Sequence, residues 1–299
     1  MKTKLSTSAN SKTAGAVHGR LMVQQLGMVP TLIGTLIISG VALSGSPAYA
    51  FQWSVTQDSS TDGYDYGRVG SPSQYEIQNA AVAQDNTTLA LAVGGNLPLA
   101  GVSNPAAKDG NVGYGAWFLN FSGKSLREAS DLGLLFAIVF AGNGEAALYG
   151  NAKATSNTAD NDGFSSYARY NTAVNRAGGS PSVGALSATD AYWGNLNDPI
   201  LNVMASGTKL GSATLLGANA LSGSGLTGNH QFGFSVSKAL LPTGNFIASL
   251  WEECGNDGIA VRDSVTATEA VPEPSSILGA IVVGGAAIGR KFRRAKSPQ

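Results

Sequence analysis

Two stretches of the sequence combine acidic side chains with glycine, as loops that bind hard cations do. Residues 160–163 read Asp-Asn-Asp-Gly, and the segment 58–65 contains Asp58, Asp62 and Asp65 around a glycine. Ca²⁺ is bound by carboxylate and amide oxygens held in tight loops. We therefore take Asp160 and Asp162 as candidate calcium ligands, and we expect no cofactor other than this structural calcium.

Neither stretch fits the EF-hand, the best-known calcium loop. That motif requires Glu at its last position, where the first stretch has Arg169 and the second has Val69. Asp, Asn and Gly also favour turns on their own account, without any metal. A solvated turn therefore stays open as the alternative at both places.

A cysteine and a histidine are of the types that form a nucleophile and its base. Cys254 is the only cysteine of the chain, which excludes an intramolecular disulfide, and His230 is the only histidine after residue 50. A thiol enzyme also needs an oriented imidazole and an oxyanion hole, and no motif here indicates either. A small side chain packed at a strand end explains Cys254 more simply.

Carboxylates near the end of the chain are the candidates for glycoside hydrolysis. Glu252 and Glu253 are adjacent, so in a strand they face opposite sides and cannot act as one pair. A glycosidase needs two carboxylates about 5–10 Å apart. Glu252 with Asp257 or Asp263 would be the pair to test, but their spacing has no distinguishing pattern. We predict that the protein is not an enzyme.

Aromatic side chains in polar stretches suggest a second function, carbohydrate binding. Exposed rings can stack on sugars while Asn and Asp bind the hydroxyl groups. The alternative is that these rings cover the hydrophobic core from the loop side. The candidates are Tyr64, Tyr66, Tyr167, Tyr170, Tyr192 and Trp193.

Short apolar or alternating runs between turn residues predict the strands that would position these side chains. Helical periodicity is scarce, and 151–231 is expected to form large loops with a strand piece at 164–170. We predict an all-β fold, an antiparallel β-sandwich of jelly-roll type. The predicted strands are 88–93, 114–121, 132–140, 230–236, 246–252 and 259–267.

The alternation also predicts which side chains face the core. Phe232, Phe234 and Val236 fall on one face of their strand. Ile259 and Val261 do the same in the last strand. The strand 132–140 is apolar on both faces, which is typical of a central, buried position.

Charge is sparse and unevenly distributed along the 299 residues. Only 13% of them are Asp, Glu, Lys or Arg, against about 25% in a typical soluble domain. Residues 1–50 hold four basic and no acidic residues, 51–271 ten and 18, and 272–299 five and one. Basic ends around an acidic middle are typical of an exported precursor, and the acidic middle excludes nucleic acid as a partner.

The N-terminal region has the parts of a secretory signal peptide. Its polar, sparsely basic start is followed by an apolar run over 26–43 and by the sequence Ser-Pro-Ala-Tyr-Ala. Ala48 and Ala50 stand at the small-residue positions that signal peptidase requires. We predict a signal peptide over 1–50 and a mature chain that starts at Phe51. An uncleaved signal anchor is the alternative.

The C-terminal region consists of a proline motif, an apolar run and a basic cluster. The motif is Val271, Pro272, Glu273 and Pro274, whose two prolines cannot continue a helix or a strand ladder. The apolar run 277–289 predicts a short transmembrane helix at about 276–289, short for a bilayer core of about 30 Å. The basic cluster should remain in the cytoplasm as a stop and leave 51–271 outside. This cluster consists of Arg290, Lys291, Arg293 and Arg294.

This C-terminal pattern resembles the PEP-CTERM sorting signal of exosortase substrates. The matching parts are Val271–Pro274, the short apolar run and the terminal basic cluster, all within 269–299. In that family a membrane-embedded cysteine protease, the exosortase, processes the chain near the Pro-Glu-Pro element. The resemblance implies that the helix is a temporary anchor. A plain tail anchor after a chance Val-Pro-Glu-Pro is the alternative.

Two parts of the middle segment are also similar to the ectodomains of cyanobacterial exosortase-dependent surface proteins. They are 226–261 and 75–101, and the first contains a Cys-Gly-Asn-Asp-Gly turn like the one near the end of those domains. The resemblance covers less than a third of the exported segment. It implies a cell-surface location and no particular chemistry.

These observations predict three parts: a signal peptide (1–50), an exported domain (51–268) and a sorting region (269–299). We expect a non-enzymatic cell-surface or secreted protein with a structural or interaction role at the envelope or in extracellular polysaccharide. Its expected partners are signal peptidase and exosortase during processing, the membrane through the C-terminal helix, and exopolysaccharide. A lectin-like carbohydrate-binding module is the alternative.

Overall fold

The structure, a computed structural model, describes residues 51–267. The predictions for the signal peptide, with Ala48 and Ala50, lie outside the described residues. So do those for the Val271–Pro274 motif, the helix at 276–289 and the basic cluster at 290–294. Within 51–267, no helix is long and apolar enough to cross a membrane.

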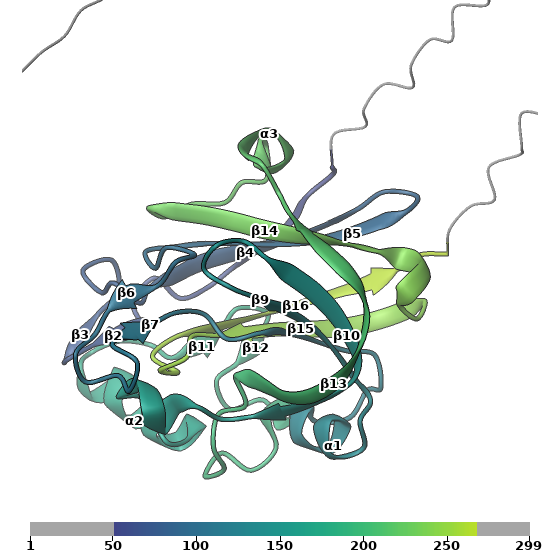
Figure 1. The fold of residues 1–299 in the computed structure, drawn as a ribbon. Helices are drawn as coiled ribbons and strands as arrows, with labels where there is room; N and C mark the ends of the chain where they lie inside the picture. The colour runs from purple at the N-terminus through teal and green to yellow at the C-terminus, as the bar shows by residue number, and fades with distance from the viewer. Residues whose placement is uncertain (1–50, 268–299) are drawn as a thin grey trace, which may run out of the picture. The chain divides into compact units, whose positions relative to one another are not determined.

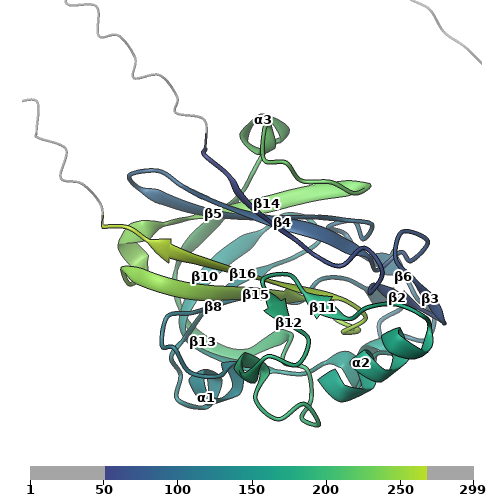
Figure 2. The ribbon, with the colours of Figure 1, turned by 180° about the vertical axis from the view of Figure 1, so that it is seen from behind.

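Ten antiparallel strands form one continuous sheet, which curves until it is nearly a barrel. Figures 1 and 2 show β14, β5 and β4 as one layer and β15, β16 and β10 as the layer that faces it. In spatial order the strands are β1 (Ser54–Gln57), β4 (Ile77–Gln84), β5 (Thr88–Gly95), β14 (His230–Ser237), β13 (Val203–Leu215), β10 (Ala146–Thr155), β9 (Leu135–Phe140), β8 (Trp117–Asn120), β15 (Gly244–Trp251) and β16 (Gly258–Val265).

The two layers are halves of this one sheet, joined through the long strand β13. Most of β13 pairs with β10 of one half, and its last residues, Thr214 and Leu215, pair with Ser235 and Phe234 of β14 in the other. The prediction of an antiparallel all-β domain is confirmed. The two halves of this sheet face each other and are continuous through β13.

Alternating apolar side chains fill the space between the two halves. Phe232, Phe234 and Val236 of β14 all point into this inner core, as the alternation predicted. Trp117 of β8 and Ile259 of β16 face them from the other half. The predicted buried strand at 132–140 is shorter than expected: β9 covers Leu135–Phe140, between β10 and β8, whereas Leu132 and Leu134 precede it and are exposed. Burying this apolar surface is the main driving force for the curved sheet.

A second core lies on the outer face of β8, β9, β15 and β16, beneath helix α2 (Tyr167–Arg176). The predicted strand at 164–170 is wrong, because this segment leads into that helix. Ser166 caps its first turn by accepting a hydrogen bond from the backbone of Arg169. Tyr167, Tyr170 and Val174 recur at helical spacing and are buried, so their period favours a helix.

The prediction of large loops over 151–231 is also wrong in part, because β13 and α2 lie there. Two short helices are also present: α1 (Leu126–Asp131), between β8 and β9, and α3 (Ala218–Leu221), which also lies within 151–231. Three short hairpins complete the fold: β2 (Tyr64–Asp65) with β3 (Arg68–Val69), β6 (Val102–Ser103) with β7 (Asn111–Val112), and β11 (Ser182–Val183) with β12 (Leu186–Ser187).

The ends of the sheet approach each other along a line that we call the seam, where β4, the neighbour of the first strand β1, faces β16. No strand ladder closes it, but side chains bridge it: Gln84 Nε2 of β4 donates to Ser264 O of β16 at 2.9 Å. The loop after β11 covers the free edge of β16, with Ala185 N donating to Ala260 O at 2.9 Å. At the seam, the two ends of the described sheet are therefore held together by side chains and by the loop after β11 instead of by a strand ladder.

Candidate metal centre

Four carboxylates gather at one end of the seam, and we call them the seam cluster: Asp58, Asp62, Glu76 and Asp257. Asp58 directly follows β1, Glu76 directly precedes β4, and Asp257 directly precedes β16. Strands that run antiparallel bring such flanking residues to the same end of a sheet. Asp62, Glu76 and Asp257 are at most 1% exposed, and Asp58 is partly buried.

The carboxylate oxygens of this cluster lie close together. Asp58, Asp62 and Asp257 each place an oxygen within 4.8 Å of the others. Glu76 lies beside them, with its Oε2 accepting a 2.9 Å hydrogen bond from the backbone N–H of Gly63. Three segments that are far apart in the sequence therefore contribute to one small volume.

The loop containing β11 supplies hydrogen bonds to two of these carboxylates. Asp58 Oδ1 accepts from Gly184 N at 2.8 Å and from the hydroxyl of Ser182. Asp62 Oδ2 accepts from Ser182 N at 2.7 Å. Gly184 has a φ of 58°, and a Cβ there would lie 2.7 Å from Ala260 O, so this position favours glycine.

Asp257 bonds across the seam itself. Its Oδ2 accepts from the backbone N–H of Ile77, the first residue of β4, at 2.7 Å. Its Oδ1 accepts from Gly258 N at 2.8 Å and from the Tyr170 hydroxyl at 3.4 Å. This side chain therefore links the start of β16 to β4 and to helix α2.

Several oxygens of the cluster have no hydrogen-bond partner among the described residues. Asp58 Oδ2, Asp62 Oδ1 and Glu76 Oε1 are all buried and unpaired. Within 51–267 the ion pairs of Lys and Arg involve other acidic residues, so no basic side chain compensates the cluster. Buried carboxylates in this state are costly unless a proton or a cation neutralises them.

The pKa values of the cluster are raised accordingly. Burial, reinforced by the negative charge of Asp58, raises the pKa of Asp62 to about 9. Burial raises the pKa of Glu76 to about 7 and that of Asp58 to about 6, although backbone hydrogen bonds lower both. The pKa of Asp257 is raised well above its usual range, first by burial and then by the charges of Asp62 and Asp58.

This arrangement suits ion binding better than reaction with a substrate. A general acid or base must reach the proton that it transfers, and Asp62, Glu76 and Asp257 are closed off from solvent. The largest cavity that we describe, about 460 Å³, lies elsewhere, between β15, β16 and the loop after β8. Its lining includes Asp263 and none of the seam cluster.

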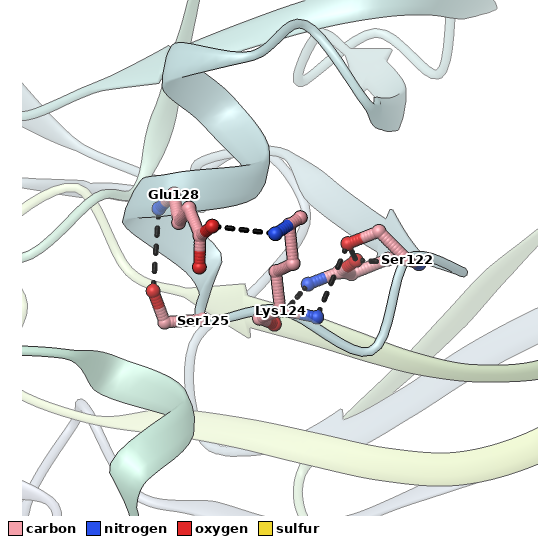
Figure 3. Close-up of polar contacts among 5 residues, drawn as sticks. Ser122, Lys124, Ser125 and Glu128 are labelled. Atoms are coloured by element: carbon pink, nitrogen blue, oxygen red, sulfur yellow. Dashed lines mark hydrogen bonds and ion pairs between the residues drawn. The ribbon is translucent and has the colours of Figure 1, made fainter.

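Figure 3 shows the loop that forms one wall of this cavity, between β8 and α1. Ser125 caps α1 by accepting from the backbone N–H of Glu128, and Lys124 pairs with the Glu128 side chain. Asn120, part of an Asn-Phe-Ser sequence, is 3% exposed and donates to Lys124 O at 2.9 Å. Its amide therefore serves to close this loop.

The predicted calcium ligands Asp160 and Asp162 lie on the surface. Asp160 forms a 3.1 Å ion pair with Lys108, and Asp162 Oδ2 accepts a 2.6 Å hydrogen bond from the Tyr66 hydroxyl. In the described part of the chain, the three-carboxylate grouping of Asp58, Asp62 and Asp257 does not include them. Calcium at this pair stays a prediction.

The two residues considered as a nucleophile and its base, Cys254 and His230, lie in different surroundings. Cys254 is 1% exposed, and its Sγ donates to Glu252 Oε2 at 3.7 Å. Burial, with the nearby charge of Glu252, raises the pKa of the Cys254 thiol well above its usual range, which disfavours a reactive thiolate. His230 is exposed at the start of β14.

Most of the candidate sugar-stacking rings belong to the second core. Tyr167, Tyr170, Tyr192 and Trp193 are at most 5% exposed and pack around Trp251 and one another. They cover the core from the loop side, which was our alternative. Tyr64 packs edge-on against Phe164, and Tyr66 is 72% exposed.

Sequence reasoning singled out Asp58 and Asp62 but missed Glu76 as a site residue and treated Asp257 only as a hydrolase candidate. Glu76 and Asp257 each directly precede a largely buried strand, and this position is the sequence signal that could have found them.

No protein-family model, curated protein or solved structure matches the chain.

Proposed function

We propose that the chain is an exported, non-enzymatic surface protein that is sorted by an exosortase. In this proposal the domain over 51–268 acts structurally, or as an interaction module, at the envelope or in extracellular polysaccharide. The signal peptide over 1–50 and the sorting region over 269–299 take it there. The two facing halves of the sheet are consistent with the jelly-roll-like sandwich class that we assign to this domain.

The observation that carries the proposal is the order of the three C-terminal elements: proline motif, short apolar run and basic cluster. The positions of the strands support it. The described sheet begins at Ser54 and ends at Val265, so neither predicted processing site interrupts a strand. Cutting after Ala50 or near Pro272 would leave all ten strands of the sheet in the mature chain.

The test is the fate of a double variant, Pro272→Ala with Pro274→Ala, in the native host. The variant should be exported and should accumulate in the membrane fraction with its C-terminus at Gln299. The wild-type chain should end near the proline motif and leave the membrane. Pro105→Ala, in an exposed turn, is the matched control. Release of the double variant at the wild-type rate would contradict exosortase sorting.

Carbohydrate binding is the second candidate, and Tyr66 is the observation that favours it. Its exposed ring lies beside a small polar cavity lined by Asn104, Asp162 and Asn256. Retention of the exported domain on the host's exopolysaccharide should fall with Tyr66→Ala and persist with Tyr66→Phe or Tyr66→Trp. Equal retention of Tyr66→Ala and the wild type would exclude this ring as the platform.

A further inference from the structure

We propose that the seam cluster is a Ca²⁺ site that fastens the first strands of the sheet to the last. The ligands would be carboxylate oxygens of Asp58, Asp62 and Asp257, with the Glu76 carboxylate beside them. This inference rests on the geometry of the described residues and does not depend on the proposed route of export.

The first argument is the set of buried oxygens without partners. Asp62 and Glu76 each use one oxygen to accept a backbone hydrogen bond and leave the other buried and unpaired. Asp58 likewise accepts hydrogen bonds at its Oδ1 and leaves its Oδ2 buried and unpaired. Backbone N–H groups thus fix the orientation of each carboxylate, while one oxygen of each remains available. This is how outer hydrogen bonds orient the ligands of a metal.

The second argument is distance. Oxygens that bind Ca²⁺ lie about 2.3–2.6 Å from the ion, so ligands on opposite sides of it are separated by about 5 Å at most. The oxygens of Asp58, Asp62 and Asp257 all lie within 4.8 Å of one another. One ion can therefore contact all three without a rearrangement of the backbone.

The third argument is the chemistry of the donors. All three ligands offer carboxylate oxygen, which selects hard cations over the softer ions that prefer thiolate or imidazole. Ca²⁺ accepts several carboxylates in an irregular arrangement, whereas Mg²⁺ demands near-octahedral geometry and usually retains several waters. A largely buried site with three carboxylates from separate segments therefore favours Ca²⁺.

The position of the cluster gives the ion a structural role. Asp58 and Glu76 adjoin β1 and β4, and Asp257 adjoins β16. A shared ion would thus hold together the two ends of a sheet that no strand ladder closes at this point. The loop containing β11, whose Ser182 and Gly184 bond to Asp58, would be ordered with it.

Terbium luminescence tests the site directly, because Tb³⁺ replaces Ca²⁺ and is excited through nearby aromatic rings. The Tyr170 hydroxyl lies 3.4 Å from Asp257 Oδ1, close enough to sensitise a bound ion. The full chain, first treated with chelator, is titrated with Tb³⁺, and the bound Tb³⁺ is then displaced with Ca²⁺ or Mg²⁺. Asp62→Asn and Asp58→Asn are the test variants, and Asp160→Asn is the matched control.

We expect sensitised emission that Ca²⁺ displaces at much lower concentration than Mg²⁺. Asp62→Asn and Asp58→Asn should weaken Tb³⁺ binding by at least about tenfold, while Asp160→Asn changes it by less than about twofold. Wild-type protein without Ca²⁺-displaceable emission would overturn the proposal, even if a variant failed to fold. Displacement by Mg²⁺ as readily as by Ca²⁺, or an equal loss in Asp160→Asn, would overturn it as well.

Discussion

The seam cluster and the surface pair Asp160 and Asp162 are built from the same residue type but lie in opposite surroundings. At the surface, each carboxylate has a partner, Lys108 or the Tyr66 hydroxyl, and is exposed to solvent. In the seam, the carboxylates lie next to one another, and buried oxygens remain unpaired. The difference shows that burial and the absence of a basic partner, rather than the Asp-Gly motif itself, indicate carboxylates that a proton or a cation must neutralise.

The largest effect should come from removing a carboxylate of the seam. Asp257→Ala leaves the backbone N–H groups of Ile77 and Gly258 without their acceptor and removes a link across the seam. We expect it to lower the free energy of unfolding by about 3 kcal/mol or more. Urea unfolding in the presence of Ca²⁺ measures this loss.

The surface pair supplies the control for that loss. Asp162→Ala removes only an exposed hydrogen bond to Tyr66, so it should change the free energy of unfolding by less than about 0.5 kcal/mol. If Asp162→Ala lowered the free energy of unfolding as much as Asp257→Ala, the seam and surface carboxylates would not differ in their contribution to stability, and the comparison would fail.

Chelation should have the next largest effect on the wild-type chain. A ligand that binds only the folded state stabilises it by about 2.7 kcal/mol when its concentration is about one hundred times its dissociation constant. The unfolding temperature of the full chain should therefore fall when excess chelator replaces Ca²⁺ at pH 8. Asp62→Asn should show the same unfolding temperature in both buffers, and a wild-type value unaffected by chelator would contradict the comparison.

The dependence of stability on pH should differ with and without Ca²⁺. Because the folded-state pKa values of Asp58, Glu76 and Asp62 are raised to about 6, 7 and 9, their protons favour the folded chain. That stability is fully present below about pH 4, where the unfolded carboxylates are also protonated. It is lost as the pH rises through the folded-state values.

In chelator, the free energy of unfolding should thus fall between about pH 5 and 9. The slope should be about 1.4 kcal/mol per pH unit for each proton that the chain releases when it unfolds. In Ca²⁺ the fall should be smaller, because the bound ion, instead of protons, neutralises the carboxylates of the folded chain. Unfolding by urea at several pH values measures both slopes. Identical slopes in the two buffers would mean that protons alone occupy the cluster.

The smallest effect should come from the exposed ion pair. Asp160→Asn removes the attraction to Lys108, which is worth about 0–1 kcal/mol at a surface and is screened by salt. Thermal unfolding of this variant at low and high salt should give nearly the same difference from the wild type. A loss comparable with that of Asp257→Ala would mean that the surface pair also has a structural role.

The sequence predicted those parts of the fold that local patterning specifies. The alternation of Phe232, Phe234 and Val236 correctly indicated both the strand and its buried face. The segment 164–170 was misassigned because its aromatic residues also suit a strand, and the capping role of Ser166 went unrecognised. The long strand β13 was missed because most of its residues are exposed and lack an apolar alternation.

The site was less predictable, because it depends on closure of the sheet. Asp58 and Asp62 stood out as an acidic pair near glycine, but Asp257 meets β4 through a contact between residues 180 positions apart. Nothing local to Glu76 or Asp257 indicates which strand lies opposite. Only the fold brings β1, β4 and β16 together, so the convergence of their flanking carboxylates could not be inferred from spacing.

The central claim is that the seam carboxylates bind a calcium ion, and calorimetric titration tests it most directly. Ca²⁺ is titrated into the chelator-treated full chain and, in parallel, into the Asp62→Asn variant. The account predicts one Ca²⁺ bound per wild-type chain, with that binding event lost in the variant. A wild-type chain that binds no Ca²⁺, or a variant that binds it with unchanged affinity, would contradict the account.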